Sequence, residues 1–152
     1  MLRTSLSVRL DADPRSVAVA RTTCRAALER LGVTEECTYD IALALAEACT
    51  NAVEHSEPVD GVVDPIEVRV DVAGAWCHIE VIDHGTGFDA CSVAFELPSA
   101  EETSGRGIAI MNEMTDQLVL QSTVGAGTRV LLAKRLALQD WSPLVSEAQQ
   151  AS

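Results

Sequence analysis

The order in which the spacing of apolar residues changes along the chain constrains its fold more than any other feature. Apolar residues alternate with polar ones from Leu6 to Leu10, which predicts a short strand. They then recur every three to four residues over 14–31 and 34–55, which predicts two helices. Alternation returns over 66–72 and 75–83 and predicts an antiparallel hairpin.

The second half of the sequence adds a loop, a helix and another hairpin. No spacing holds over 84–104, where Gly, Pro, Ser and Glu are frequent, so we expect a long loop there. Residues 107–114 predict a short helix, and residues 118–122 and 128–134 predict two more strands. This order favours an α+β two-layer sandwich, in which a mixed, mostly antiparallel sheet carries helices on one face.

The length of 152 residues is typical of one domain. We assign residues 1–138 to that domain and expect the polar residues 139–152 to form a weakly ordered tail. Neither a signal segment nor a run near the ~20 apolar residues of a membrane span is present, so we expect a soluble, cytoplasmic chain without membrane contact. The five cysteines include no Cys-x-x-Cys pair, which favours buried free thiols over a zinc or redox site.

Charge narrows the possible ligands. A formal net charge of −12 repels a phosphate backbone, so we expect no nucleic-acid partner. The only lysine, Lys134, follows no glycine, which excludes a phosphate loop of the Gly-Lys-Ser/Thr type. A phosphate site in this chain must rely instead on backbone N–H groups and a helix N-terminus.

A polar stripe lies on the second predicted helix. Glu47 and Asn51 are four residues apart, so their side chains are neighbours on one face, with Glu54 and His55 nearby. Such a stripe is consistent with a solvated helix face. It is equally consistent with a site in which the amide oxygen binds Mg²⁺ and the carboxylate accepts a proton.

Three glycine turns follow predicted elements. The first, Asp83-His-Gly85-Thr-Gly87, ends a strand, where an aspartate can accept a hydrogen bond from an amino group. The second, Ser104-Gly105-Arg106-Gly107-Ile108, leads into a helix and exposes N–H groups suited to phosphates. The third, Gly125-Ala-Gly127-Thr128, is consistent with a simple hairpin turn. A dinucleotide-binding Gly-x-Gly-x-x-Ala turn at 85–90 is disfavoured, because no βαβ unit surrounds it.

Together these segments resemble the four boxes of the GHKL (Bergerat-fold) ATPases. Glu47-Ala-Cys-Thr-Asn51-Ala-Val-Glu-His55 is similar to the N-box, and Asp83-x-Gly85-x-Gly87 to the G1 box. Gly105-x-Gly107-Ile108 is similar to the G2 box, and Gly127-Thr128 to the last box. The boxes occur in the family's order over residues 40 to 132, and the short single domain resembles the bacterial anti-sigma-factor serine kinases of the RsbW and SpoIIAB type.

The resemblance assigns roles residue by residue. It implies that Glu47 is the general base and Asn51 the Mg²⁺ ligand. It implies that Asp83 holds the amino group of adenine, that Thr128 assists through water, and that Gly85 and Gly87 let the chain pass close to the base. The other residues expected at ATP are Ser104, Gly105, Arg106, Gly107 and Ile108, and a lid is expected near 89–104.

The implied function is an ATP- and Mg²⁺-dependent protein-serine kinase that acts as an anti-sigma factor. Its expected partners are a STAS-type anti-anti-sigma protein that it phosphorylates, a sigma factor that it sequesters, and a second copy of itself. The alternative is a non-catalytic module that binds a partner in an ATP-gated way. A histidine-kinase catalytic domain is disfavoured, because no helical hairpin with a phosphoacceptor histidine precedes the boxes in this sequence. A gyrase- or MutL-type ATPase is disfavoured, because it needs further domains.

Overall fold

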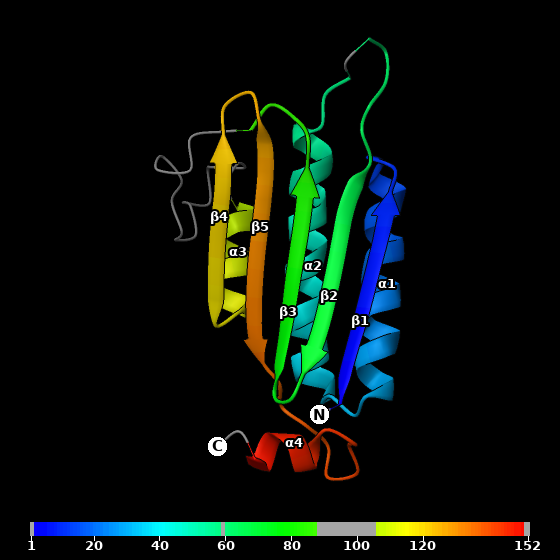
Figure 1. Cartoon of the computed structure of the whole chain (residues 1–152), viewed down its shortest axis with the longest axis vertical. Coiled ribbons are helices and arrows are strands. Elements are labelled where there is room, and N and C mark those ends of the chain that lie inside the picture. Colours follow the sequence, from blue (N-terminus) through cyan, green and yellow to red (C-terminus); the bar gives the residue numbers. More distant parts are fainter. Residues whose placement is uncertain (1, 59, 88–105, 151–152) are drawn as a thin grey trace.

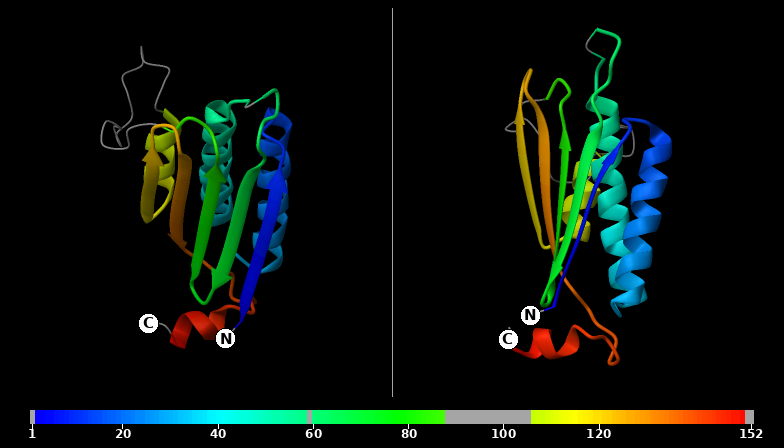
Figure 2. Two further views of the ribbon diagram at one scale, coloured as in Figure 1. Left: turned by 45° about the horizontal axis from the view of Figure 1, so that its top comes forward. Right: turned by 45° about the vertical axis from the view of Figure 1, so that its right-hand side comes forward.

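The computed structural model describes residues 2–58, 60–87 and 106–150. The helices within residues 14–114 lie on one face of a twisted sheet, and the last helix lies beyond its lower end, as Figures 1 and 2 show from three directions. The elements are β1 (Arg3–Leu10), α1 (Pro14–Arg30), α2 (Glu35–His55), β2 (Ile66–Ala73), β3 (Trp76–Asp83), α3 (Arg106–Met114), β4 (Gln117–Thr123), β5 (Gly127–Arg135) and α4 (Val145–Gln150). No helix in these described residues has the length and apolarity needed to cross a membrane.

Local signals in the sequence set the ends of the two long helices. The Asp13 carboxylate accepts a hydrogen bond from the Arg15 N–H at 2.8 Å, and Pro14 supplies a preset φ at the first position of α1. Gly32, at φ +78°, follows α1 in the left-handed conformation that glycine adopts without strain. Thr34 caps α2 in the same way as Asp13, through the Cys37 N–H at 3.3 Å.

The sheet has the strand order β1-β2-β3-β5-β4, and each of its four pairings is antiparallel. The expected α+β sandwich with helices on one face is confirmed. The sheet was expected to be mixed, but no parallel pair occurs among the described strands, because β5 inserts antiparallel beside β3. This insertion brings the start of β5 next to the end of β3, where Asp83 and Thr128 are register partners.

The core lies between the sheet and the helices α1, α2 and α3, with α2 contributing the most residues. One face of β2 and β3 is lined by buried apolar side chains, while Ile41, Ala44 and Leu45 of α2 are 0% exposed. The four described cysteines are buried free thiols, as expected. Burial raises the pKa of both Cys24 and Cys49 to about 12, so these thiols stay protonated at neutral pH.

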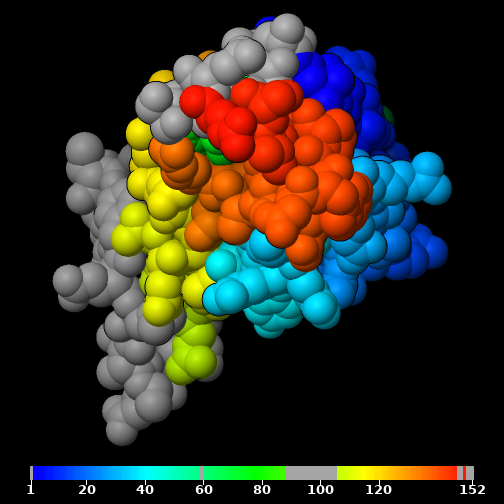
Figure 3. Space-filling view, turned by 90° about the horizontal axis from the view of Figure 1, so that it is seen from below, coloured from blue at the N-terminus to red at the C-terminus, as the bar shows by residue number. Residues whose placement is uncertain are grey.

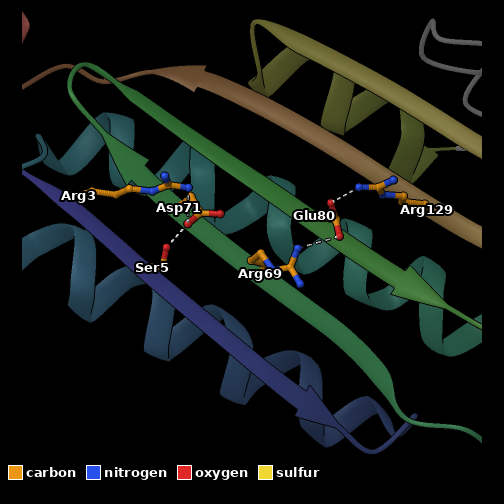
Figure 4. A network of polar contacts seen from close by, with 6 residues as sticks. All are labelled: Arg3, Ser5, Arg69, Asp71, Glu80 and Arg129. Atoms are coloured by element: carbon orange, nitrogen blue, oxygen red, sulfur yellow. Dashed lines mark hydrogen bonds and ion pairs between the residues drawn. The ribbon is translucent and has the colours of Figure 1, made fainter.

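The outer face of the sheet carries paired charges instead of a helix layer. Glu80 lies between two arginines, 3.5 Å from Arg69 and 2.6 Å from Arg129 (Figure 4). Asp71 similarly contacts Arg3 and the Ser5 hydroxyl. These cross-strand pairs explain how alternating charged residues remain stable on a face that no described helix covers.

The segment after β5 folds back under the helices, which differs from the weakly ordered tail expected from residue 139. Gln139 N–H bonds the Gly32 carbonyl at 2.7 Å, the Ser142 hydroxyl bonds the Leu31 carbonyl at 2.5 Å, and Leu144 is 0% exposed. Figure 3 shows this segment, in orange and red, spread over the lower end of the molecule. The reason is tertiary: the segment pairs with the α1–α2 connection, where Gly32 and Val33 are buried.

Candidate functional site

Glu47 is the first residue of the polar stripe on α2, and it faces α3. This half-buried carboxylate lies against the first turn of α3, because a Cβ built on Gly107 would come within 2.9 Å of Glu47 Oε2. Burial, and secondarily repulsion from Glu54, raises the pKa of Glu47 above its ordinary value. A carboxylate with a raised pKa beside a helix N-terminus is suited to accept a proton from a group held at that terminus.

Asn51 lies one turn further along α2. Its Nδ2 atom is buried and has no hydrogen-bond partner among the described residues. A buried amide without a partner is costly, so the side chain fits a site that a further group completes. Its carbonyl oxygen is the type of ligand Mg²⁺ takes, and Mg²⁺ in phosphate-transfer sites commonly uses one or two protein ligands together with substrate phosphates.

Metal binding by the protein alone is a separate question. Within residues 2–58, 60–87 and 106–150, no group of three or more His, Cys, Asp or Glu side chains is placed to hold a metal ion. Glu47 and Asn51 lie one turn apart on α2, and Glu47 contacts the first turn of α3.

Asp83 ends β3 as a charged residue that is only 4% exposed. Burial raises the pKa of its carboxyl, while hydrogen bonds from the backbone of Gly85 and Thr128 and the positive field of His55 partly offset this. The Gly85 N–H lies 3.0 Å from Asp83 Oδ1. The carboxylate is therefore held by backbone donors at the end of the sheet, in the place expected for an acceptor of an amino group.

The turn after Asp83 passes very close to the end of α2. A Cβ at Gly85 would lie 1.7 Å from the His55 carbonyl oxygen, and the Thr86 N–H bonds that same oxygen at 3.2 Å. Gly87 has a φ of +66° and passes the Thr123 carbonyl, 2.1 Å from where its Cβ would be. Glycine is therefore required at these two positions because the backbone passes close to other backbone atoms. The resemblance had implied a different reason, namely that the two glycines let the chain pass close to the base.

Thr128 is the second residue of β5 and is only 3% exposed. It lies opposite Asp83 on one side and opposite Ser122 of β4 on the other. Its hydroxyl is 2.7 Å from the Ser122 hydroxyl. The sequence did not single out Ser122; its place after Leu118 and Leu120 on the inward alternation becomes informative only once the β4–β5 register is known.

A hollow of about 420 Å³ adjoins this polar row. Its lining includes Asp83, Ser122 and Thr128, and also Ile82, Gln121 and Arg129, which alternate to the outward face of the sheet. The hollow therefore borders residues of both faces at this end of the sheet.

The predicted residues at the second glycine turn divide into three cases. Arg106 and Gly107 form the first turn of α3, with Arg106 exposed to solvent. Ile108 is 8% exposed and belongs to the hydrophobic core, so only its backbone can face a ligand. Ser104, Gly105 and the predicted lid near 89–104 lie outside the described residues.

One helix thus joins two clusters. Glu47, Asn51 and His55 follow each other at intervals of four residues along α2. Glu47 meets the N-terminal turn of α3, and the His55 carbonyl meets the turn after Asp83. An N-terminal turn attracts phosphate through its free N–H groups and dipole, while the Asp83 end offers acceptors to a base. The arrangement is suited to a nucleotide lying along α2.

Comparisons with known proteins found a matching family and similar relatives. The family model "Histidine kinase-like ATPase domain" matches residues 10–134. An anti-sigma F factor of Thermoanaerobacter sp. is 34% identical over 76% of this chain and 82% of its own length. One from Clostridium acetobutylicum is 31% identical over 91% of this chain and 98% of its own. The serine-protein kinase RsbW of Bacillus licheniformis is 29% identical over 86% of this chain and 85% of its own.

A solved structure is also similar. The RsbU and RsbW domains of a Mycobacterium tuberculosis protein give a TM-score of 0.66 at 25% identity, over 88% of this chain. The match spans only 32% of that longer chain, so its remaining parts have no counterpart here. With a family match over most of the sequence and relatives above 30% identity over 82% and 98% of their own length, this chain belongs to the histidine kinase-like ATPase domain family.

Proposed function

We propose that this chain is an ATP-dependent protein-serine kinase that acts as an anti-sigma factor. Relatives that it covers almost completely are called anti-sigma F factor, and another is called a serine-protein kinase. The observation that carries the catalytic part is the position of Glu47, whose carboxylate lies against the first turn of α3 at Gly107. A carboxylate next to the expected phosphate-binding turn supports a role for Glu47 as the proton acceptor.

The proposed division of labour follows the two clusters. Asp83 accepts a hydrogen bond from the amino group of adenine, and Thr128 assists it. Backbone N–H groups of the α3 first turn, with Gly105, Arg106 and Gly107, bind phosphate oxygens. Asn51 would hold Mg²⁺, which when bound neutralises phosphate charge. Glu47 accepts the proton of the attacking serine hydroxyl, so the protein mainly positions groups and stabilises charge.

The proposed substrate is a serine of a STAS-type anti-anti-sigma protein, and the second partner is a sigma factor withheld from RNA polymerase. A chain with a formal net charge of −12 suits a basic partner surface such as one that binds DNA. Action on a sigma factor places the protein in the cytoplasm. A homodimer is part of the same proposal, and light scattering at several concentrations tests it.

The deciding experiment uses the protein, γ-labelled Mg-ATP and the partner captured from the native bacterium. We expect label on a serine of the captured protein with the unmodified chain and none with Glu47→Gln. Both should bind Mg-ATP in calorimetry. Glu36→Gln, the same change at the exposed start of α2, is the matched control and should transfer label normally.

Each other outcome has a defined meaning. Absence of Mg-ATP binding by the unmodified chain would contradict the nucleotide site itself. Binding of ATP and partner without transfer of label would favour the non-catalytic, ATP-gated module. Equal transfer by the Glu47→Gln variant and the unmodified chain would remove Glu47 from the reaction.

A further inference from the structure

The outward face of the sheet, which no described helix covers, differs between its two halves. On β1 and β2 the outward positions carry polar side chains apart from Ala73, and several of them pair across the strands (Figure 4). On β5 and β4 this pattern breaks. The outward positions there, which we call the β4–β5 patch, are Arg129, Leu131, Ala133, Arg135, Gln117, Val119, Gln121 and Thr123.

The centre of the β4–β5 patch is apolar. The water-facing side of an antiparallel sheet normally carries polar side chains at its outward positions. Val119 is instead 46% exposed, its register partner is Leu131, and Ala133 follows two positions further along β5. These three residues and His78 of β3 line an open hollow of about 300 Å³. The patch therefore resembles a surface that packs against another protein element more than a surface that faces water alone.

The charge of the outward face is opposite in sign to that of the chain. The five described strands carry five of the eleven basic residues at outward positions, but only three of the 23 acidic ones. The face therefore has a formal charge of +2, whereas the whole chain has −12. The residues concerned are Arg3, Arg9, Arg69, Arg129, Arg135, Glu67, Asp71 and Glu80. No outward position of β4 or β5 is acidic.

An arginine lies at each end of the apolar centre. Arg129 and Arg135 are six residues apart on β5, which is about 20 Å along a strand. Arg129 shares the Glu80 carboxylate with Arg69, at 2.6 and 3.5 Å, so two guanidinium groups face one carboxylate (Figure 4). The positive charge at this place is therefore only partly balanced. A length of about 20 Å equals a helix of about 13 residues.

We propose that the β4–β5 patch is a docking surface for an acidic amphipathic helix of a partner protein. Apolar side chains of that helix pack on Leu131 and Val119, much as helices cover the other face of the sheet. Carboxylates near its two ends reach Arg129 and Arg135. A second copy fits less well, because two copies that meet through this face bring one positive face against another. The inference does not depend on the proposed kinase activity.

The test measures binding of a synthetic peptide by tryptophan fluorescence. Trp76 lies on β3 as the register partner of Arg135, and Trp141→Phe makes it the only tryptophan. The probe is a peptide of about 18 residues with leucines at helical spacing, glutamates near both ends and alanine or glutamine elsewhere. We expect it to shift the Trp76 emission, with an affinity that falls as salt is added. A peptide with lysine in place of each glutamate should leave the emission unchanged.

Variants of the patch locate the binding. The double variant Arg129→Gln/Arg135→Gln should weaken binding of the acidic peptide at least about tenfold, because it removes both charges that the carboxylates reach. Val119→Asp should weaken binding similarly, because it places a carboxylate in the apolar centre. The matched control, Arg21→Gln/Arg25→Gln, makes the same change at exposed positions of α1 and should bind the peptide normally. Thermal unfolding of each variant checks that the fold is retained.

Four results would overturn the inference. The first is that the acidic peptide fails to bind at low salt, and the second is that the arginine double variant binds it as tightly as the control. The third is a stable dimer in light scattering that Val119→Asp converts to a monomer, because the occupant of the patch is then a second copy. The fourth is a Trp76 response to vesicles of anionic lipid and none to the peptide, which would assign the patch to a membrane surface.

Discussion

The carboxylate of Glu47 lies against the backbone of Gly107, so that a single added methyl group at Gly107 would come within 2.9 Å of Glu47 Oε2. These two residues are 60 positions apart in the sequence. The contact joins the polar stripe of α2 to the first turn of α3. It makes Gly107 a structural requirement for the position of the proposed base.

Gly107→Ala should therefore impair transfer more than stability. Glu47 must move away from the methyl group, and misplacement of a reacting group by about 1 Å can cost roughly 100-fold in rate. Alanine in a helix is otherwise up to about 1 kcal/mol better than glycine. We expect phosphoryl transfer to fall about 10- to 100-fold with an unchanged or higher midpoint of thermal unfolding. An unchanged rate would contradict the proposed role of Glu47.

The pH dependence of transfer should report the Glu47–Glu54 pair. Glu47 acts as a base only when ionised, so the rate falls as pH drops through its raised pKa. Glu54→Gln removes the like charge and lowers the pKa of Glu47. The acidic limb of the rate profile should then move to lower pH, with little change in the plateau. Glu113→Gln, on the exposed side of α3, is the control and should leave the acidic limb at the same pH. If Glu54→Gln also leaves the acidic limb at the same pH, the coupling between Glu47 and Glu54 is contradicted.

Asp83→Asn should stabilise the fold while weakening nucleotide binding. Because burial raises the folded-state pKa of Asp83 above its ordinary value, Asp83 binds its proton more tightly when folded. Its contribution to stability is fully present below pH ~3.8 and is lost as pH rises through the folded-state pKa. Asparagine does not ionise and so does not lose this stability as the pH rises. We therefore expect the free energy of unfolding of Asp83→Asn to exceed that of the unmodified chain by about 1 kcal/mol at pH 7, and the difference to shrink toward pH 4.

Thermal or urea unfolding between pH 7 and pH 4 measures the difference between the two chains, which cancels the other titrating groups. Asp64→Asn, at an exposed position, should change stability by less than about 0.5 kcal/mol. Affinity for ATP should fall at least about tenfold in Asp83→Asn, since asparagine has one acceptor oxygen where the carboxylate has two, and the Gly85 N–H already uses one. A stability difference that grows with acid would reverse the assigned sign.

Gly85→Ala tests the contact between the turn and α2. The added methyl would lie 1.7 Å from the His55 carbonyl oxygen, a backbone atom that cannot move without shifting the helix end. We expect a loss of about 3 kcal/mol or more, together with loss of nucleotide binding. Gly74→Ala is the control: its φ of +58° costs about 1 kcal/mol, but nothing lies within 4 Å of the new methyl. Equal costs for the two variants would contradict the close approach at His55.

The segment after β5 should contribute to stability through Leu144. This side chain is 0% exposed, so Leu144→Ala should cost about 2 to 5 kcal/mol in urea unfolding. Trp141 is larger but 64% exposed, and Trp141→Ala should change stability by less than about 1 kcal/mol. A near-zero effect of Leu144→Ala would restore the view of residues 139–152 as a weakly ordered tail.

Local spacing and capping determined much of this protein from the sequence alone. Apolar residues at helical or alternating intervals predicted each element from β1 to β5, and Asp13, Thr34 and Gly32 marked helix ends through contacts with near neighbours in the chain. The sequence also predicts that Glu47 lies near Asn51 and Asp83 near Gly85. Residues four apart on a helix or two apart in a turn are close in any fold.

The tertiary structure decided which distant residues meet. Only the insertion of β5 between β3 and β4 sets Ser122, Thr128 and Asp83 in one row, and only the packing of α3 beside α2 brings Gly107 to Glu47. The burial of Leu144 under the α1–α2 connection was equally beyond local patterns. Periodicity depends on neighbours along the chain, whereas strand register and close backbone approach depend on how whole elements pack, which no local spacing encodes.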